Sequence, residues 1–372
     1  MAERNLQEIP YYPILQFGIK GLNNELSPEY IQDNELADAE NVVFEDGVLT
    51  SRPGSSLFYE GIFTALRDIY TAKDTAEKEW LLAIGKDSNG NGIVAVYDER
   101  TNRFVKISDT LSIDTSRQFS FVTWNQGLGN DRVYFSQGLK TYKWIIGVSW
   151  TSANLGGTET SIPVEDARRF PSGGGKIVIS DINTGNIFIR DYTSKTGNNL
   201  NLASGQTAPA VATGSFVAIV ISDVTSVIEP GQAIEIWQNR LVVGRKGDET
   251  PNQLAYSDVK NPEAFGSASE PAKGGFTLIA DGAGKIVGLV NLFQYLLVIK
   301  KDNFVRFDLQ PSPDYTKKIE TVFPFVWSEG IGCVTHKSII RAHNNVYYIA
   351  NNGNVYVLVG VQTGASTSIN IN

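Results

Sequence analysis

The chain has 372 residues, and 32 Lys and Arg against 40 Asp and Glu give it a formal net charge of −8. Charged residues make up 19%, below the roughly 25% usual for soluble domains, whereas Gly is abundant at 35 residues. Gly disfavours helix interiors, and the apolar content of 42% is near the normal range, so this composition disfavours a helical bundle, a coiled coil and a disordered tail. An acidic chain without clustered Lys and Arg is also a poor general binder of nucleic-acid phosphates.

Cys333 is the single cysteine, which excludes an intrachain disulfide and a Cys-based zinc cage. The N-terminus lacks the apolar core of a signal peptide, and no apolar run approaches the length of a membrane span. We therefore expect no membrane span, and no cofactor is indicated.

The first 60 residues are expected to form an extended N-terminal arm and a first strand. Residues 1–20 carry Tyr11, Tyr12 and Phe17 in no regular pattern. An apolar arm without a core of its own packs either along its own domain or on a neighbouring subunit. Helical patterns are rare, with one candidate after Ser27-Pro28 and a second over residues 35–41.

Most of the remaining chain has the pattern of short strands, rich in Val, Ile, Tyr and Phe and bounded by turn residues. They are expected at residues 80–84, 92–97, 133–135, 240–243, 296–299, 304–309, 346–349 and 355–359.

A hairpin pattern recurs along the chain, with an apolar strand, a turn of Gly, Asn, Asp or Lys, and an aromatic-rich strand. Its copies start at Trp80, Asp131, Asn239, Gln294 and Asn345, at intervals of 51, 108, 55 and 51 residues. A period of about 50 residues with two strong strands per unit is typical of β-propeller blades. Radial packing buries both faces of each small sheet, which one sheet alone cannot do.

The fold class predicted is therefore all-β, a β-propeller of about five to six blades. Unrelated hairpins in a sandwich are the alternative. A sixth blade would combine a strand near residues 41–49 with C-terminal segments. The propeller is expected in two parts, residues 61–150 and 229–372, separated by residues 151–228. That stretch is rich in Gly, Thr, Ser and Asn. This composition indicates a small β domain inserted into a connection between blade strands, where insertions are tolerated.

One segment resembles a calcium loop. Asp87, Asn89 and Asn91 are followed by Gly92, and Asp98 lies eleven residues after Asp87. Only two carboxylates are available and the flanks are strands, so a plain hairpin turn is the preferred interpretation.

Other chemical patterns are weaker. The Gly-rich stretches 172–176 and 281–285 lack the Ser or Thr and the helix of a phosphate loop. Cys333 and His336 differ in strand parity, which argues against a Cys-His dyad, and His343 reads as a turn residue.

Glycoside cleavage would need two paired carboxylates. Acidic residues are scattered through the turns, and we interpret them as solvated: Asp68, Asp131, Asp258, Glu263, Asp281, Asp302 and Glu329. The six tryptophans, at positions 80, 124, 144, 150, 237 and 327, would stack sugars or, as we prefer, fill cores and interfaces. No catalytic, cofactor or metal residue is assigned, and the chain is not expected to be an enzyme.

Short motifs in both halves of the chain carry a family resemblance. In the N-terminal part they are residues 21–23, 37–44, 47–49 and 52–54. In the second half they are residues 237–244, 256–258, 261–265, 330–339 and 352–353. These motifs resemble those of tail hub, nozzle or stabilisation proteins of tailed bacteriophages. Within the inserted stretch, residues 161–167 and 196–200 resemble small β modules of other phage structural proteins.

The resemblance implies a virion protein of the phage tail, assembled in the host cytoplasm, that forms a homo-oligomeric ring, expected to be a hexamer. It implies portal and adaptor proteins and tail fibres or spikes as partners, and a sealed channel through which DNA passes without specific binding. A position as adaptor or stopper in the neck stays open. Tyr11, Tyr12 and Phe17 are the predicted subunit interface.

Two alternatives remain. The first is a carbohydrate-binding or receptor-binding tail protein, with the inserted domain as the binding module. The second is a propeller glycosidase.

Overall fold

The computed structural model describes residues 42–45, 48–51, 61–109, 111, 113–246, 250–265, 274–278, 284–292, 295–309, 321–329, 331–342, 345–359 and 368–370. The chain divides into two units, residues 1–60 and 61–372. In the first unit β1 (Val42–Glu45) and β2 (Val48–Ser51) form an antiparallel hairpin, where the sequence predicts a strand. The two helix candidates, together with Tyr11, Tyr12 and Phe17, lie outside the described residues.

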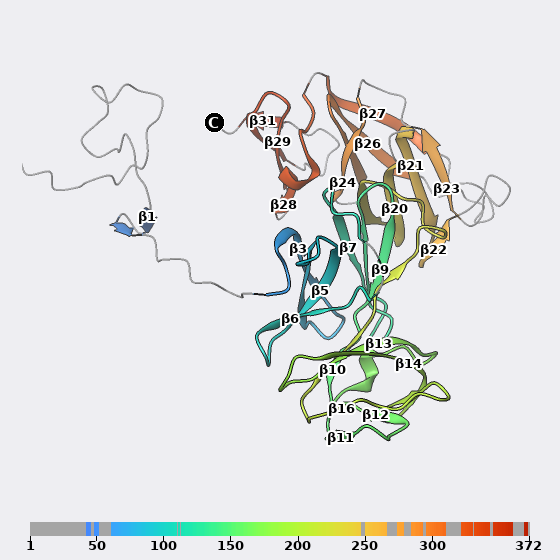
Figure 1. Ribbon diagram of the computed structural model, residues 1–372. Coiled ribbons are helices and arrows are strands. Elements are labelled where there is room, and N and C mark those ends of the chain that lie inside the picture. Colours follow the sequence, from blue (N-terminus) through green and yellow to red (C-terminus); the bar gives the residue numbers. More distant parts are fainter. Residues whose placement is uncertain are drawn as a thin grey trace, which may run out of the picture. The chain divides into compact units, whose positions relative to one another are not determined.

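The second unit contains five antiparallel sheets in succession, which we number blades 1 to 5 (Figure 1). Blade 1 has β3 (Ala65–Lys73), β4 (Glu79–Lys86), β5 (Gly92–Asp98) and β6 (Arg103–Lys106). Blade 2 has β7 (Ser120–Trp124), β8 (Arg132–Ser136), β9 (Thr141–Ile145) and β18 (Ser222–Asp223).

Blade 3 has β19 (Ala233–Trp237), β20 (Arg240–Lys246) and β21 (Thr250–Asp258), with β22 (Asn261–Phe265) and β23 (Gly275–Leu278) both paired to β21. Blade 4 has β24 (Ile286–Leu292), β25 (Tyr295–Lys300), β26 (Asn303–Leu309) and β27 (Thr321–Glu329). Blade 5 has β28 (Ile340–Ala342), β29 (Asn345–Ile349), β30 (Val355–Val359) and β31 (Ser368–Asn370).

The first strands of consecutive blades pack against one another. Strand β3 contacts β7, β7 contacts β19, and β19 contacts β24. The chain then enters blade 5 through the 3-10 turn η4 (His336–Ser338), which contacts β24. The predicted all-β propeller class is therefore confirmed, with five blades among the described residues. Among those residues no helix reaches the length and apolar character of a membrane-crossing segment.

The repeated hairpins of the sequence are the second and third strands of each blade. These strands lie inside their sheets and are buried on both faces, as in β5 and β25, where six and five residues respectively are buried. A strand covered on both faces needs a nearly continuous apolar sequence, which is why these hairpins stand out.

Eight short strands lie between β9 and β18 of blade 2. A six-stranded sheet runs in the order β10 (Val148–Trp150), β17 (Phe216–Ile219), β13 (Gly175–Ser180), β14 (Ile187–Thr196), β15 (Asn199–Leu202) and β12 (Ser161–Pro163). Strands β11 (Leu155–Gly156) and β16 (Ala210–Val211) form a separate pair, and η2 (Ala167–Arg169) is a 3-10 turn. We call this group the inserted module.

The central sheet of the inserted module separates two cores. Side chains alternate across a strand, so Ile177 and Ile179 enter the core of the module, whereas Val178 enters the core shared with blades 1 and 2. In β17, likewise, Val217 faces the first core and Phe216 the second. The module is thus packed on the blades by the second face of its own sheet.

Candidate functional site

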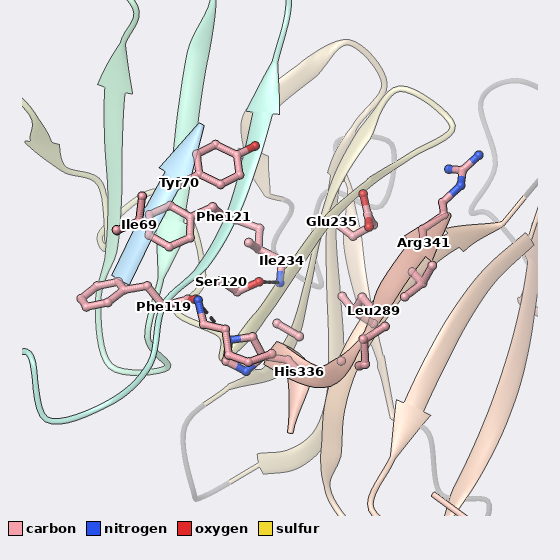
Figure 2. A pocket seen from close by; sticks show the side chains of 15 residues that line it. Ile69, Tyr70, Phe119, Ser120, Phe121, Ile234, Glu235, Leu289, His336 and Arg341 are labelled. Carbon is pink, nitrogen blue, oxygen red and sulfur yellow. Dashed lines mark hydrogen bonds between the residues drawn. The ribbon is translucent and has the colours of Figure 1, made fainter. Parts of the chain in front are cut away.

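A pocket of about 280 Å³ lies where the first strands of the blades meet. Its lining comes from β3, β7, β19 and β24, and from η4 and β28 of the chain entering blade 5 (Figure 2). We call it the axial pocket. Tyr70 and Phe121 form part of its wall with stacked rings, whose centroids are 4.8 Å apart.

Side chains join the first strand of one blade to the backbone of the next. The hydroxyl of Ser120 accepts a hydrogen bond from the backbone N–H of Ile234 at 3.2 Å. Asn291 donates to the carbonyl of Ile236 at 3.1 Å, and Arg341 donates to the carbonyl of Asn291 at 2.8 Å. Each hydrogen bond satisfies a backbone N–H or carbonyl group at a strand edge. Burying such a group without a partner would cost free energy. Together they connect blades 2, 3, 4 and 5.

Blade 5 is joined back to blades 1 and 2 by charged and polar side chains. Lys337 makes an ion pair of 2.5 Å with Asp68, whose other oxygen accepts from the backbone N–H of Phe119 at 2.8 Å. His336 contacts the carbonyl of Phe119 at 3.1 Å, and Thr335 donates to Gln118 at 3.2 Å. The titratable residues of this region therefore link blades to one another.

Two of these groups have shifted pKa values. Burial raises the pKa of Glu235, and the backbone N–H groups of Ile236 and Asn291 and the charge of Arg341 oppose this shift. Burial lowers the pKa of His336, so the neutral imidazole is favoured. Among the described residues that line the axial pocket, Glu235 is the one carboxylic acid. The paired carboxylates that glycoside cleavage requires are thus not assembled by this lining.

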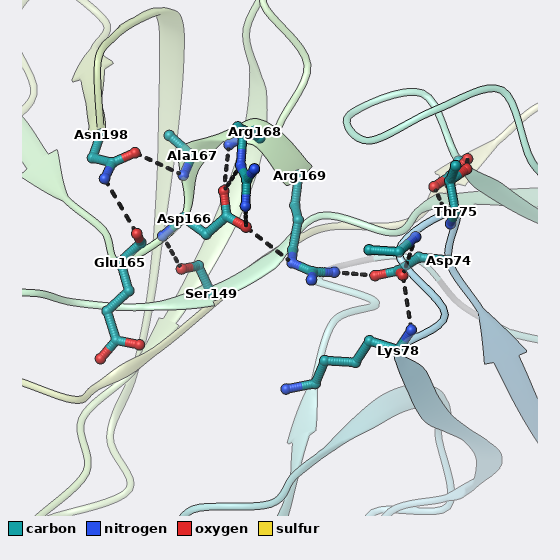
Figure 3. A network of polar contacts seen from close by, with 12 residues as sticks. Asp74, Thr75, Lys78, Ser149, Glu165, Asp166, Ala167, Arg168, Arg169 and Asn198 are labelled. Atoms are coloured by element: carbon teal, nitrogen blue, oxygen red, sulfur yellow. Dashed lines mark hydrogen bonds and ion pairs between the residues drawn. The ribbon is translucent and has the colours of Figure 1, made fainter.

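A second polar network joins the inserted module to blade 1 (Figure 3). Asp74 is 1% exposed and accepts hydrogen bonds from the backbone of Ala76 and Lys78 and from the indole of Trp80. Arg169 of η2 forms an ion pair with the same carboxylate and a second one with Asp166 at 3.6 Å. A bidentate pair between Arg100 and Glu165, both bonds at 2.7 Å, reinforces this contact.

The calcium-like spacing forms an ordinary hairpin turn. Asp87 accepts from the backbone N–H groups of Asn89 and Asn91, and Gly90 has a φ of 79°. Asp98 lies at the far end of β5, where it accepts from Arg100 and Trp150. Residues 92–97 of β5 lie between this turn and Asp98, and they span about 20 Å of extended strand. No metal-like group of three His, Cys, Asp or Glu side chains occurs in the described part of the chain.

The Gly-rich stretches and Cys333, which were weak candidates for chemical sites, lie at ordinary structural positions. The Gly-rich stretch 172–176 leads into β13, and the described end of the stretch 281–285 leads into β24, so each precedes a strand. Cys333 is buried, with its sulfur near the carbonyl of Thr335 and the hydroxyl of Ser338, both at 3.2 Å. Residues 336–338 form η4, and the next strand, β28, begins at Ile340. His343 lies outside the described residues.

The carboxylates expected to be solvated differ from that prediction at three positions. Asp68 is 8% and Asp131 is 1% exposed, and Glu263 is partly buried among three donors. Asp131 accepts from the backbone N–H groups of Gln126 and Gly127 and from both the N–H and the hydroxyl of Thr75. These three acids connect different blades, which a single sequence does not reveal. Asp281 is not described.

The prediction that tryptophans fill cores is confirmed where the structure describes them. Trp80, Trp124, Trp144, Trp150 and Trp237 are each at most 7% exposed. Cationic side chains pack on two of them, with Lys78 over both Trp80 and Trp150 and Arg100 over Trp150. The sequence did not single out Glu235, because an acid between two isoleucines in a strand has the ordinary pattern of a solvent-facing position.

Comparison with protein-family models and with curated proteins finds no match. Among solved structures, the chain is similar to a lectin of Aleuria aurantia in complex with alpha-methyl-L-fucoside, at 12% identity and a TM-score of 0.26, covering 82% of this chain and 94% of the lectin. The chain is also similar to a CNH domain of AfRom2, at 9% identity and a TM-score of 0.25, covering 89% of this chain and 93% of that domain. A third similar structure is AofleA from Arthrobotrys oligospora, at 11% identity and a TM-score of 0.23, covering 84% of this chain and 89% of AofleA. The fold assignment rests on the strand pairing of this chain.

Proposed function

We propose that this chain is a structural protein of a phage tail, a ring-forming hub or nozzle component beneath the portal and adaptor. The observation that carries the proposal is the use of the titratable side chains around the axial pocket. Lys337 and Asp68 pair with each other, and His336 and Arg341 bind backbone carbonyls of other blades. Groups used in this way suit a rigid scaffold, and the motifs of the sequence supply the phage-tail context.

Exposed apolar side chains on blades 1 and 5 support a multimeric role. Leu66 and Ile69 of β3 are 54% and 53% exposed, and Val334, Ile340 and Ile349 are 58%, 60% and 43% exposed. Lys337 and Asp68 bring these two blades together, so the exposed residues lie on neighbouring parts of one unit. A contiguous apolar surface on joined blades would be typical of a site that binds another protein. We assign them to contacts with a second copy of this chain.

The acidic balance suits a DNA conduit. Six copies at −8 each would carry a formal charge of about −48, and a lining that bound phosphates would slow the passing duplex. The proposal places acidic residues on the channel surface of the ring. An electropositive channel in a reconstruction of the assembled ring would contradict this part of it.

Electron microscopy of the full chain, with and without portal–adaptor complexes, tests the proposal. Closed rings that dock on the connector are the expected result. Particles that remain monomeric in both samples would refute it. Release of reducing sugar from host polysaccharide, abolished by one carboxylate substitution, would favour the glycosidase alternative instead.

The predicted interface in the arm gives a second test. Deletion of residues 1–20, or combined alanine substitution of Tyr11, Tyr12 and Phe17, should leave a folded monomer that no longer assembles. Native mass spectrometry measures the oligomer, and unchanged rings would refute this assignment of the interface.

A further inference from the structure

A second pocket, of about 480 Å³, lies between blades 2 and 3. Trp124, Asn125, Gln126 and Asn130 line it from the end of β7 and the following turn. Ile236 of β19, Asn239 of the turn between β19 and β20, and Lys260 of the turn between β21 and β22 complete the lining. We call it the inter-blade pocket. Its volume lies within the range of about 300–1,000 Å³ that small-molecule sites occupy.

The rim of the inter-blade pocket is fixed by hydrogen bonds between its loops. Gln126 donates to the carbonyl of Lys260 at 3.1 Å, and the N–H of Lys260 donates to the carbonyl of Asn239 at 2.7 Å. The buried Asp131 holds the first loop from below through the N–H of Gln126 at 2.8 Å. A site whose loops are already tied together loses less entropy when it binds a ligand.

The backbone at the rim is held in an uncommon conformation. Gln238, Asn239 and Lys260 have φ angles of 47°, 56° and 59°. Gln238 and Asn239 are the two loop residues of the β19–β20 hairpin, a turn whose geometry uses positive φ at both positions. Lys260, in the turn before β22, has a positive φ that is unusual for Lys. These two turns place Asn239 and Lys260 in the lining of the pocket.

The chemistry of the lining indicates the class of ligand. Four amide side chains each offer donors and an acceptor, which matches the hydroxyl groups of a sugar. Trp124 and Ile236 supply apolar surface beneath them, and Lys260 adds a positive charge. The seven described lining residues include no carboxylate that would repel an anion.

We propose that the inter-blade pocket binds a carboxylate-bearing sugar residue. Lys260 pairs with the carboxylate, while Asn125, Asn130 and Asn239 bind the hydroxyl groups. This goes beyond the scaffold role, because it gives the tail component a direct contact with acidic polysaccharide. The site lies in the blades, whereas the carbohydrate-binding alternative raised by the sequence places sugar binding in the inserted module.

A matched pair of ligands tests the proposal on the full chain. Methyl β-D-glucuronide and methyl β-D-glucoside differ in the carboxylate, and saturation-transfer NMR and calorimetry measure their binding. In low salt the glucuronide should bind about fivefold more tightly than the glucoside, because the ion pair with Lys260 is then little screened. If neither sugar binds, the proposal is overturned. Equal displacement of the glucuronide by inorganic phosphate would also overturn it, by showing a plain anion site.

Two variants separate the roles within the pocket. Lys260→Asn removes the charge but keeps a residue that accepts positive φ, so the preference for glucuronide should vanish while glucoside binding stays. Lys106→Asn, on β6 outside the pocket, is the matched control and should keep the preference. Asn125→Ala should weaken both sugars and provides the test if the Lys260 variant fails to fold. A preference that survives in Lys260→Asn, or unchanged binding in Asn125→Ala, would refute the assigned roles.

Discussion

Replacing Glu263 by Gln should weaken the contact between blades 2 and 3. Oε1 of Glu263 on β22 accepts hydrogen bonds from Arg132 and from Tyr134, both at 2.8 Å. Lys143 approaches the same carboxylate at 3.0 Å and 3.1 Å. Glu263→Gln leaves the shape almost unchanged but leaves two cations beside a neutral amide.

The magnitude follows from the burial of the three charged groups. The side chains of Glu263, Arg132 and Lys143 are 24%, 23% and 17% exposed. Breaking a fully buried ion pair costs about 3–5 kcal/mol, and an exposed pair contributes at most about 1 kcal/mol. Residual exposure, and the hydrogen bond that the Gln carbonyl can still accept from Tyr134, place the expected loss at about 2–3 kcal/mol.

The pH dependence of this loss has a defined sign. Burial acts to raise the pKa of Glu263, but hydrogen bonds from Lys143 and Tyr134 and the charges of Lys143 and Arg132 outweigh it, so the pKa lies below its ordinary value. The stabilisation is therefore fully present above the unfolded value of about 4.3 and is lost as the pH falls through the folded value. The difference in the free energy of unfolding between wild type and Glu263→Gln should be constant from about pH 6 to 8 and should shrink below about pH 4.

Urea unfolding followed by tryptophan fluorescence measures the difference at each pH. Glu99→Gln is the matched control, because Glu99 pairs with Lys78 on the surface and is 56% exposed. That control should change the free energy of unfolding by less than about 0.5 kcal/mol. A similarly small loss in Glu263→Gln at pH 7, or a loss that does not change with pH, would refute the reasoning.

Three further substitutions test other parts of the unit. Glu235→Gln should stabilise the protein at pH 7, because burial raises the pKa of Glu235 and its ionisation opposes folding as the pH rises above about 4.3; denaturant titration showing a loss would contradict this. Burial lowers the pKa of His336, so wild-type stability should fall as the pH drops below about 6.5, and an equal fall in His336→Gln would contradict that source. Gly332→Ala should cost about 1–3 kcal/mol, since its Cβ would lie 2.1 Å from the carbonyl of Lys301, whereas Gly173→Ala meets no atom within 4 Å and should be near neutral in a thermal melt.

The sequence predicts the middle strands of the blades far better than the strands at their edges. Strand β5 has a continuous apolar pattern because sheets cover both of its faces, and its position was expected. Strand β3 lines the axial pocket, yet only two of its nine residues are buried. The charged and apolar residues of β3 show no clear period. The strand is held by contacts with side chains of other blades, and few of its own side chains are buried.

The same reason limits prediction of the sites. The spacing of Asp87 and Asp98 matches a calcium loop, but the preferred interpretation is a hairpin turn, and strand β5 indeed separates the two carboxylates. In contrast, Ser120 and Ile234 are far apart in the sequence and meet because first strands of consecutive blades pack together. A repeat of hairpins predicts that such contacts exist, but the residues that make them depend on where each first strand begins.

The inserted module illustrates how the fold limits what a functional test can isolate. Its β17 contributes Phe216 to the core shared with blades 1 and 2, and Trp150 of β10 enters the same core. Cutting the chain around residues 151–228 would expose these side chains and leave Asp74 without its partner Arg169. A fragment of this kind would bind other surfaces through newly exposed apolar groups. Sugar binding by an isolated module is therefore weak support for a receptor role, and binding by the full chain with matched pocket variants is the stronger criterion.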